Sequence, residues 1–153
     1  MAQRWRTVAA IAGGLFAVNV VARLVVRWGY PGDDYAADAA TLAMLAAVGV
    51  GCLAVAAWWT PSRPAGAWAA DLAAASAAGL LLAILVGPLL SGTGPFSYGA
   101  GEFFKQVWQW AGVSVVGALV GTGAVTALGQ DHRSRGLARF ARERLAGARK
   151  PRR

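Results

Sequence analysis

Apolar residues fill four long stretches of the chain, and polar residues gather between them. The stretches cover about residues 7–26, 39–59, 72–90 and 107–128. An α-helix needs about twenty predominantly apolar residues to cross the hydrocarbon core of a bilayer. A surface helix of a water-soluble protein would instead carry a polar face repeating every 3.6 residues. The pattern therefore predicts an all-α integral membrane protein, a four-helix bundle with four transmembrane helices in residues 1–130.

Aromatic residues and a proline mark the ends of these stretches. Trp5 precedes the first stretch and Trp28 follows it, as expected at a membrane–water boundary. Pro61 follows the second stretch and cannot continue a helix. Arg4 before an apolar run also resembles the start of a signal peptide, but the run continues into residues 19–23 with no A-x-A cleavage site at its end. We therefore expect an uncleaved first helix.

Composition and charge add an orientation to this architecture. The chain has 153 residues, of which 57% are hydrophobic and 14% charged, with a net charge of +8. If both termini lie on one side, that side carries twelve lysines and arginines and the other side three. Basic residues favour the cytoplasmic side, so we expect both termini in the cytoplasm. The abundance of Ala, Gly and Arg suggests a bacterium, and hence its inner (cytoplasmic) membrane.

Small residues recur every four positions along two of the predicted helices. Gly79 and Ala83 belong to such a ladder in the third, and Gly117 and Gly121 form a GxxxG pattern in the fourth. Small residues let membrane helices approach closely. The ladders predict packing within the bundle, or docking of a partner membrane protein or a second copy of the chain.

A polar stripe interrupts the outer end of the first predicted helix. Asn19, Arg23 and Arg27 are spaced four apart and share a helix face. The nearest acids in sequence are Asp34 and Asp38, also four apart. One interpretation is a salt-bridged lock that closes the first helical hairpin. The other is an outward-facing pocket for an anionic headgroup or substrate.

The outer loop before the fourth predicted helix is rich in aromatic residues. Tyr98, Glu102, Phe103 and Trp108 lie within eleven positions, with helical spacing that suggests a short interfacial helix leading into the span. Aromatic residues of this kind anchor a chain at the interface. A pocket for a lipid, a quinone or a partner helix is the alternative.

The last segment, residues 131–153, combines arginines with a helical apolar face. This pattern is typical of a basic amphipathic helix that lies on a membrane surface. Each basic residue near anionic lipid contributes about 1 kcal/mol. Nucleic-acid binding is disfavoured because the segment has no recognised fold and no base-stacking platform beyond one phenylalanine. The residues expected at the lipid surface are Arg135, Arg139, Phe140, Arg142 and Leu145.

The chain offers few groups for chemistry. Its only histidine is His132 and its only cysteine is Cys52, so neither a metal cluster nor a CxxC pair is predicted. No G-x-S-x-G, P-loop, GxGxxG or H-E-x-x-H motif occurs. Asp71, at the start of the third predicted helix, is expected to stabilise that helix N-terminus, with Arg63 nearby. We predict no cofactor and no catalytic residues.

These observations predict a non-enzymatic accessory or scaffold protein that acts through helix packing and its lipid-binding tail. The expected partners are the bilayer, anionic lipids, and a membrane protein or a second copy of the chain. The main alternative is a small transporter or lipid-handling protein that uses Arg23, Arg27 and the aromatic loop. A membrane enzyme using Glu102 is a weaker third option.

Overall fold

The computed structural model describes residues 2–90, 92–94, 96–97 and 99–148. This part of the chain contains helices and connecting segments but no strand. Four helical stretches are long and apolar enough to cross a membrane, which confirms the predicted helical architecture and its four apolar spans. The helices are α1 (Ala2–Gly29), α2 (Asp34–Trp59), α3 (Ala65–Leu85), α4 (Gly87–Leu90), α5 (Gly99–Ala127) and α6 (His132–Ala148).

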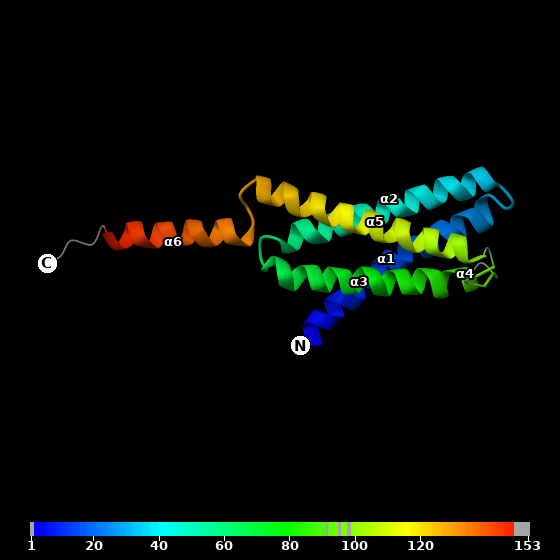
Figure 1. The fold of residues 1–153 in the computed structure, drawn as a ribbon, viewed down its shortest axis with the longest axis horizontal. Coiled ribbons are helices and arrows are strands. Elements are labelled where there is room, and N and C mark those ends of the chain that lie inside the picture. The colour runs from blue at the N-terminus through cyan, green and yellow to red at the C-terminus, as the bar shows by residue number, and fades with distance from the viewer. Residues whose placement is uncertain (1, 91, 95, 98, 149–153) are drawn as a thin grey trace.

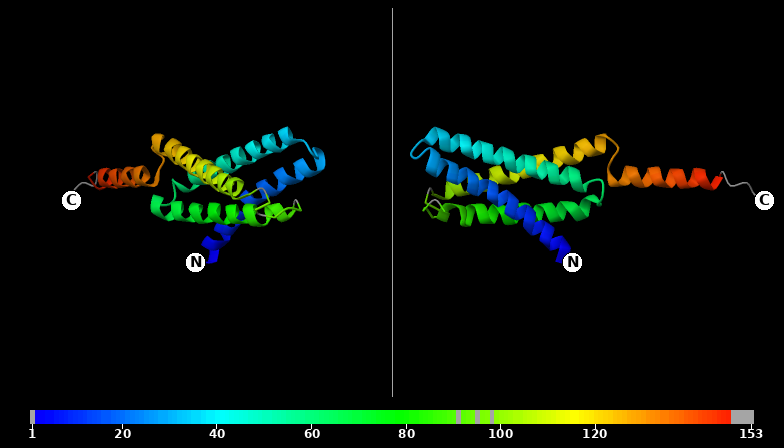
Figure 2. Two further views of the ribbon diagram at one scale, coloured as in Figure 1. Left: turned by 45° about the vertical axis from the view of Figure 1, so that its right-hand side comes forward. Right: turned by 180° about the vertical axis from the view of Figure 1, so that it is seen from behind.

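The first five helices form one elongated bundle, and α6 projects from one of its ends (Figure 1). The most extensive packing joins α2 to α5, whereas α1 packs on α3 and α2. The packing of α3 on α5 is much more limited. The two helices diverge toward the end where α3 begins and α5 ends, as Figures 1 and 2 both show. A groove lined by side chains of both helices lies between them.

A proline explains the main difference from the predicted helix boundaries. The sequence pattern predicts one helix over 72–90, but α3 ends at Leu85 and the short α4 follows. Pro88 has no backbone N–H to donate to the carbonyl four residues earlier, and its ring crowds that carbonyl. The chain therefore breaks at Val86 and resumes as α4. The predicted interfacial helix of the outer loop forms the first turns of α5, continuous with the span.

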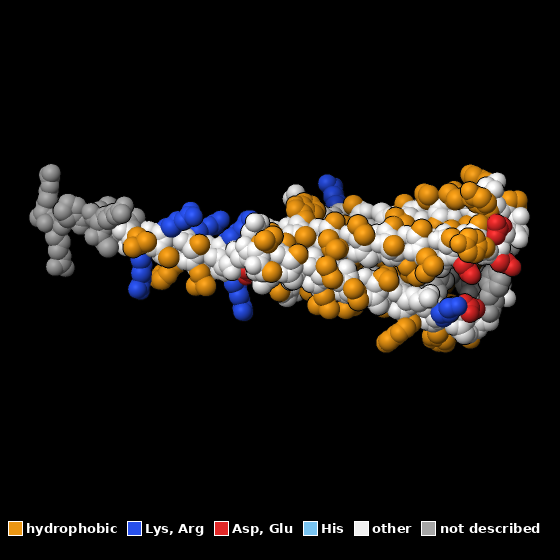
Figure 3. Space-filling model, turned by 90° about the horizontal axis from the view of Figure 1, so that it is seen from above, with side chains coloured by type: hydrophobic (Ala, Val, Ile, Leu, Met, Phe, Trp, Pro, Cys, Tyr) orange, Lys and Arg blue, Asp and Glu red, His pale blue; other side chains and the backbone are white. Residues whose placement is uncertain are grey.

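Small side chains allow the centre of the bundle to be dense. Val48, Cys52 and Ala56 of α2 are completely buried, and so is the large Trp110 of α5. Hydrophobic side chains nevertheless cover much of the outer surface along the bundle (Figure 3). A water-soluble monomer rarely exposes so continuous an apolar surface. The same surface suits helices surrounded by lipid.

Candidate functional site

The GxxxG face of α5 packs against α2 of the same chain. A Cβ atom added at Gly117 would collide with the carbonyl oxygen of Gly49. One added at Gly121 would collide with the carbonyl oxygen of Leu53. In both places backbone meets backbone, which only glycine permits. The structure thus places this face inside the bundle, where α2 already occupies it.

The small-residue ladder of α3 also faces inward. A Cβ atom added at Gly79 would lie 3.2 Å from Cβ of Leu15 and 3.3 Å from the carbonyl oxygen of Ala12, both on α1. Ala83 is fully buried. The two ladders therefore serve different pairs of helices, α3 with α1 and α5 with α2.

Asn19 is the centre of a buried polar cluster near the end of the bundle opposite α6. Its side chain is 1% exposed. Asn19 Nδ2 donates a hydrogen bond to the sulfur of Met44 over 2.9 Å, and Asn19 Oδ1 accepts one from Arg23 Nε over 3.0 Å. A Cβ atom added at Gly87 would lie 2.7 Å from Asn19 Oδ1, so the cluster needs glycine there. Asn19 thus joins α1 to α2 beside the start of α4.

Arg27 extends this cluster to the end of α4, where its guanidinium donates to the carbonyl oxygen of Leu90. A cation is favourable at the carbonyl end of a helix. Asp34 and Asp38, the acids expected to pair with the arginines, lie exposed at the start of α2 and form no ion pair among the described residues. Asp33 caps α2 by accepting from the backbone N–H of Ala36, which sets the turn with these acids facing outward. The contacts of Asn19 and Arg27 therefore join α1 to α2 and to α4, in place of the expected ion pairs with the two acids.

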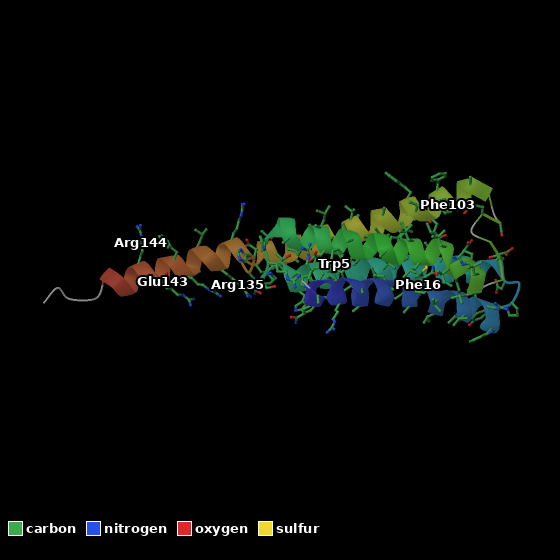
Figure 4. The ribbon with its side chains drawn as sticks, turned by 90° about the horizontal axis from the view of Figure 1, so that it is seen from below. Trp5, Phe16, Phe103, Arg135, Glu143 and Arg144 are labelled. Carbon is green, nitrogen blue, oxygen red and sulfur yellow. The ribbon has the colours of Figure 1, made fainter. Side chains whose placement is uncertain are left out.

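The outer aromatic loop forms a ring cluster around Phe103, one of the predicted residues. Phe103 lies 4.7 Å from Phe96 and 5.5 Å from Phe104 between ring centroids, and Figure 4 shows it toward the end away from α6. Glu102 pairs with Lys105 at 3.4 Å. The exposed Trp108 lines a separate shallow groove between α2 and α5. Tyr98 lies outside the described residues.

A buried acid ties three segments together at the α6 end of the bundle. Asp71 is 5% exposed, and its Oδ1 lies 2.5 Å from Nη2 of Arg4. Its Oδ2 lies 3.4 Å from Nη1 of Arg63, as the sequence suggested. The sequence did not indicate Arg4, because 67 positions separate it from Asp71. The three residues, which we call the Asp71 cluster, join the start of α1 and the α2–α3 turn to α3.

A chain of partly buried hydrogen bonds crosses from α5 to α3. Trp110 Nε1 donates to Ser76 Oγ over 3.1 Å, and Ser76 Oγ donates to Ser114 Oγ over 2.9 Å. The sequence predicts that the face of the fourth span bearing Ser114 can form interhelical hydrogen bonds, whereas it does not single out Ser76. Two serines inside spans rich in alanine were the available signal, since hydroxyls in lipid seek partners on neighbouring helices.

Beside this chain of hydrogen bonds lies an apolar groove between α3 and α5, which we call the α3–α5 groove. It has a volume of about 500 Å³. Trp68 lines it and is 6% exposed, and no described residue accepts a hydrogen bond from its Nε1. The other lining residues are Ala69, Leu72, Ala73, Ser76, Ala77, Leu80, Trp110, Ala111, Ser114, Val115, Ala118, Leu119 and Thr122.

The basic helix α6 begins at one end of the bundle and contacts it only at its start. The backbone N–H of His132 donates to the carbonyl oxygen of Thr60 over 3.1 Å. The helix then projects away from the bundle (Figure 1), and Figure 4 shows its charged side chains away from other helices. Leu137, Phe140 and Leu145 are 71%, 56% and 68% exposed. Residues 132–148 of the predicted segment are helical and residues 149–153 lie outside the described part of the chain, but the direction of α6 differs from that of a helix lying flat on a membrane.

Asp131 caps α6, since its Oδ2 accepts from the backbone N–H groups of Arg133 and Ser134 over 3.1 and 3.4 Å. A hydrogen bond from the Ser134 side chain, followed by these backbone bonds, lowers the pKa of Asp131.

The lowered pKa of Asp131 predicts when this cap is lost. A carboxylate favoured in the folded state stabilises the helix above its unfolded pKa of about 3.9, and the stabilisation disappears as pH falls through the lower folded pKa. The first turn of α6 should thus be insensitive to pH from neutrality down to about 4 and should fray below it. An NMR titration that follows the Ser134 amide resonance with pH measures this fraying. In Asp131→Asn, which keeps a neutral cap, the transition should vanish; its persistence would assign it to another group.

No group of three or more His, Cys, Asp or Glu side chains suited to a metal occurs among the described residues. The arrangement instead offers structural polar clusters, one apolar groove and one exposed basic helix. Comparisons of the chain with known protein families, with curated proteins and with solved structures found no match.

Proposed function

We propose that the chain is a small non-enzymatic accessory or scaffold protein of a bacterial cytoplasmic membrane, anchored by its bundle and engaging anionic lipid through α6. The observation that supports this most is the exposed apolar face of α6, formed by Leu137, Phe140 and Leu145. Apolar area in water is costly until something covers it. A bilayer is the nearest surface for a helix that begins where a spanning helix ends.

Charge selects the kind of bilayer. The described side chains of α6 include five arginines and one glutamate, Glu143. Basic side chains flanking an apolar face favour an anionic lipid surface. Both termini then belong on the cytoplasmic side, in agreement with the distribution of lysine and arginine.

Binding to the surface requires α6 to turn from the direction in Figure 1. The connection between α5 and α6 is short and is fixed by few contacts. Gly129, two residues beyond the end of α5, has a φ of +64°, a conformation that suits glycine, and the His132–Thr60 hydrogen bond fastens the start of α6. Because α6 packs on no other described helix, turning it sacrifices few contacts.

A fluorophore on the apolar face of α6 tests this proposal in the full-length protein. We would replace the buried Cys52 by alanine, label Ala141→Cys, and place the protein in nanodiscs of phosphatidylcholine with or without phosphatidylglycerol. Burial of the label should require phosphatidylglycerol. Arg139→Glu with Arg142→Glu should weaken it at least thirtyfold, since each arginine contributes about 1 kcal/mol.

The matched control is Arg139→Lys with Arg142→Lys, which keeps the charge and should keep the binding. Equal burial of the label in phosphatidylcholine alone would contradict the role of charge. Binding of RNA at about 0.15 M salt in place of lipid would replace the proposal with nucleic-acid recognition. The scaffold role separately predicts a stoichiometric protein partner after purification in mild detergent.

The transporter alternative has weaker support. It requires Arg23 and Arg27 to face an anionic ligand, whereas Arg23 donates to Asn19 and Arg27 to the Leu90 carbonyl. The Arg27 contact joins α1 to α4, and the Arg23 contact supports Asn19, whose own bond to Met44 joins α1 to α2.

A further inference from the structure

The α3–α5 groove is shaped for a narrow apolar object. It lies where α3 and α5 diverge (Figures 1 and 2) and has a volume of about 500 Å³, within the range of ligand pockets. Its walls are mostly apolar and include small side chains, such as Ala73 and Ala77 on α3 and Ala111 and Ala118 on α5. A groove between two spanning helices opens sideways to lipid, so a hydrocarbon chain can enter along its length.

The polar groups within the groove are largely committed to one another. Trp110 donates to Ser76, and Ser76 donates to Ser114. The Thr122 hydroxyl donates to the carbonyl oxygen of Ala118 in its own helix. A polar group of an occupant would find few hydrogen-bond partners at this depth, whereas an apolar chain needs none. The middle of the groove therefore favours hydrocarbon.

The α6 end of the groove has a different chemistry. Trp68 lines the groove there, and its indole N–H has no hydrogen-bond partner among the described residues. A buried donor without a partner carries a free-energy cost that a nearby acceptor oxygen removes. A small rotation of the indole would present this N–H to an ester or phosphate oxygen at the mouth of the groove.

Charge at the same end favours an anion. Leu72, which lines the groove, directly follows Asp71. Asp71 faces two arginines, Arg4 and Arg63, so the Asp71 cluster retains one positive charge. The side chain of Arg63 is 38% exposed and can offer further donors. An apolar slot that ends beside a surplus cation matches an amphiphile with an anionic headgroup.

We propose that the α3–α5 groove binds one acyl chain of an anionic glycerophospholipid, with the headgroup beside Arg63 and an acceptor oxygen at Trp68. The lipid fills the side of the bundle where α3 and α5 diverge. This site rests on the membrane location in the proposed function but is independent of lipid binding by α6. A second protein helix is the competing occupant. It is disfavoured because a helix about 10 Å across that ran beside residues 68–80, a length of about 18 Å, would fill on the order of 1,400 Å³, whereas the groove has a volume of about 500 Å³.

Native mass spectrometry of the full-length protein from mild detergent tests the site, with phosphatidylglycerol and phosphatidylcholine as probes. Wild-type protein should retain one phosphatidylglycerol in preference to phosphatidylcholine. Ala73→Phe places a ring in the groove and should reduce retention roughly tenfold. The matched control is Ala74→Phe, because Ala74 is exposed beside Ala73 but does not line the groove. It should retain lipid like the wild type.

A second variant separates headgroup from chain. Arg63→Gln should lower the preference for phosphatidylglycerol over phosphatidylcholine about fivefold, as expected for one basic residue, while an acyl chain is still retained. Equal retention by the Ala73→Phe and Ala74→Phe proteins would overturn the proposal. So would a co-purifying protein that Ala73→Phe alone displaces, because a helix would then fill the groove.

The charge-reversed variant of α6, Arg139→Glu with Arg142→Glu, distinguishes this site from the surface helix. The groove lipid should persist in that variant. If its retained phosphatidylglycerol disappears while Ala73→Phe has no effect, the lipid belongs to α6; the groove site is then overturned and the proposed function stands. If the label on α6 is never buried while Ala73→Phe still removes the lipid, the groove site stands and the proposed role of α6 fails.

Discussion

Gly117→Ala and Gly121→Ala should each destabilise the bundle by about 1–3 kcal/mol, the usual cost of overpacking a dense contact. The added methyl group would meet the carbonyl oxygen of Gly49 in one case and that of Leu53 in the other. Both obstacles are backbone atoms, which cannot move aside as a flexible side chain can. Helices α2 and α5 would have to separate along their whole contact, the most extensive in the bundle.

Gly123→Ala is the matched control for this seam. Gly123 lies on the same helix, and a Cβ atom there would meet no atom within 4 Å. Alanine favours helix over glycine, so this change should leave stability equal or raise it by up to about 1 kcal/mol. Unfolding of the purified protein by titration with a denaturing detergent measures all three. If Gly117→Ala behaved like Gly123→Ala, α2 and α5 would not be in close backbone contact at this seam.

The sequence predicted the small-residue seams but not the helices they join. Spacing of four shows that Gly117 and Gly121 share a face and that close approach is possible there. The spacing does not indicate which helix packs against this face. The partner helix contributes backbone atoms there, and every residue has those. The spacing therefore favours packing within the bundle but leaves docking to another protein open, and the contacts with Gly49 and Leu53 decide between them.

Span positions were predictable because length and hydropathy depend on the composition of each stretch alone. Ion-pair partners were harder, since nearness along the chain is a weak guide to nearness in the fold. Asp34 and Asp38 follow Arg27 closely, yet Arg27 reaches the carbonyl of Leu90, 63 positions away. A backbone carbonyl carries no sequence signature, so reasoning from charged residues alone could not have found it.

The direction of α6 shows another limit. Its composition predicts a helix with apolar and basic faces, and α6 does form. Composition does not specify the angle at which a helix leaves the one before it. That angle depends on Gly129, on the Asp131 cap and on the hydrogen bond from His132 to Thr60.

Replacing both arginines of the Asp71 cluster should cost more stability than replacing Asp71 itself. Arg4→Gln with Arg63→Gln leaves a carboxylate that is 5% exposed without a cation. An uncompensated charge in a dry site costs about 3–5 kcal/mol of stability. The two arginine side chains are 54% and 38% exposed, so water reaches this cluster and we expect a smaller cost of about 2–3 kcal/mol. Asp71→Asn instead leaves two arginines that water can solvate, so its cost should be below about 1 kcal/mol.

The triple variant, Arg4→Gln, Arg63→Gln and Asp71→Asn, decides whether charge is responsible. Removing the orphaned charge should recover most of the stability that the double variant loses, since a neutral amide is far cheaper to bury than a carboxylate. The same detergent titration measures each variant, and a double-mutant cycle isolates the coupling. If the triple variant proved no more stable than the double, the arginines would act through contacts other than the ion pair, including the guanidinium of Arg63 over the Trp59 ring.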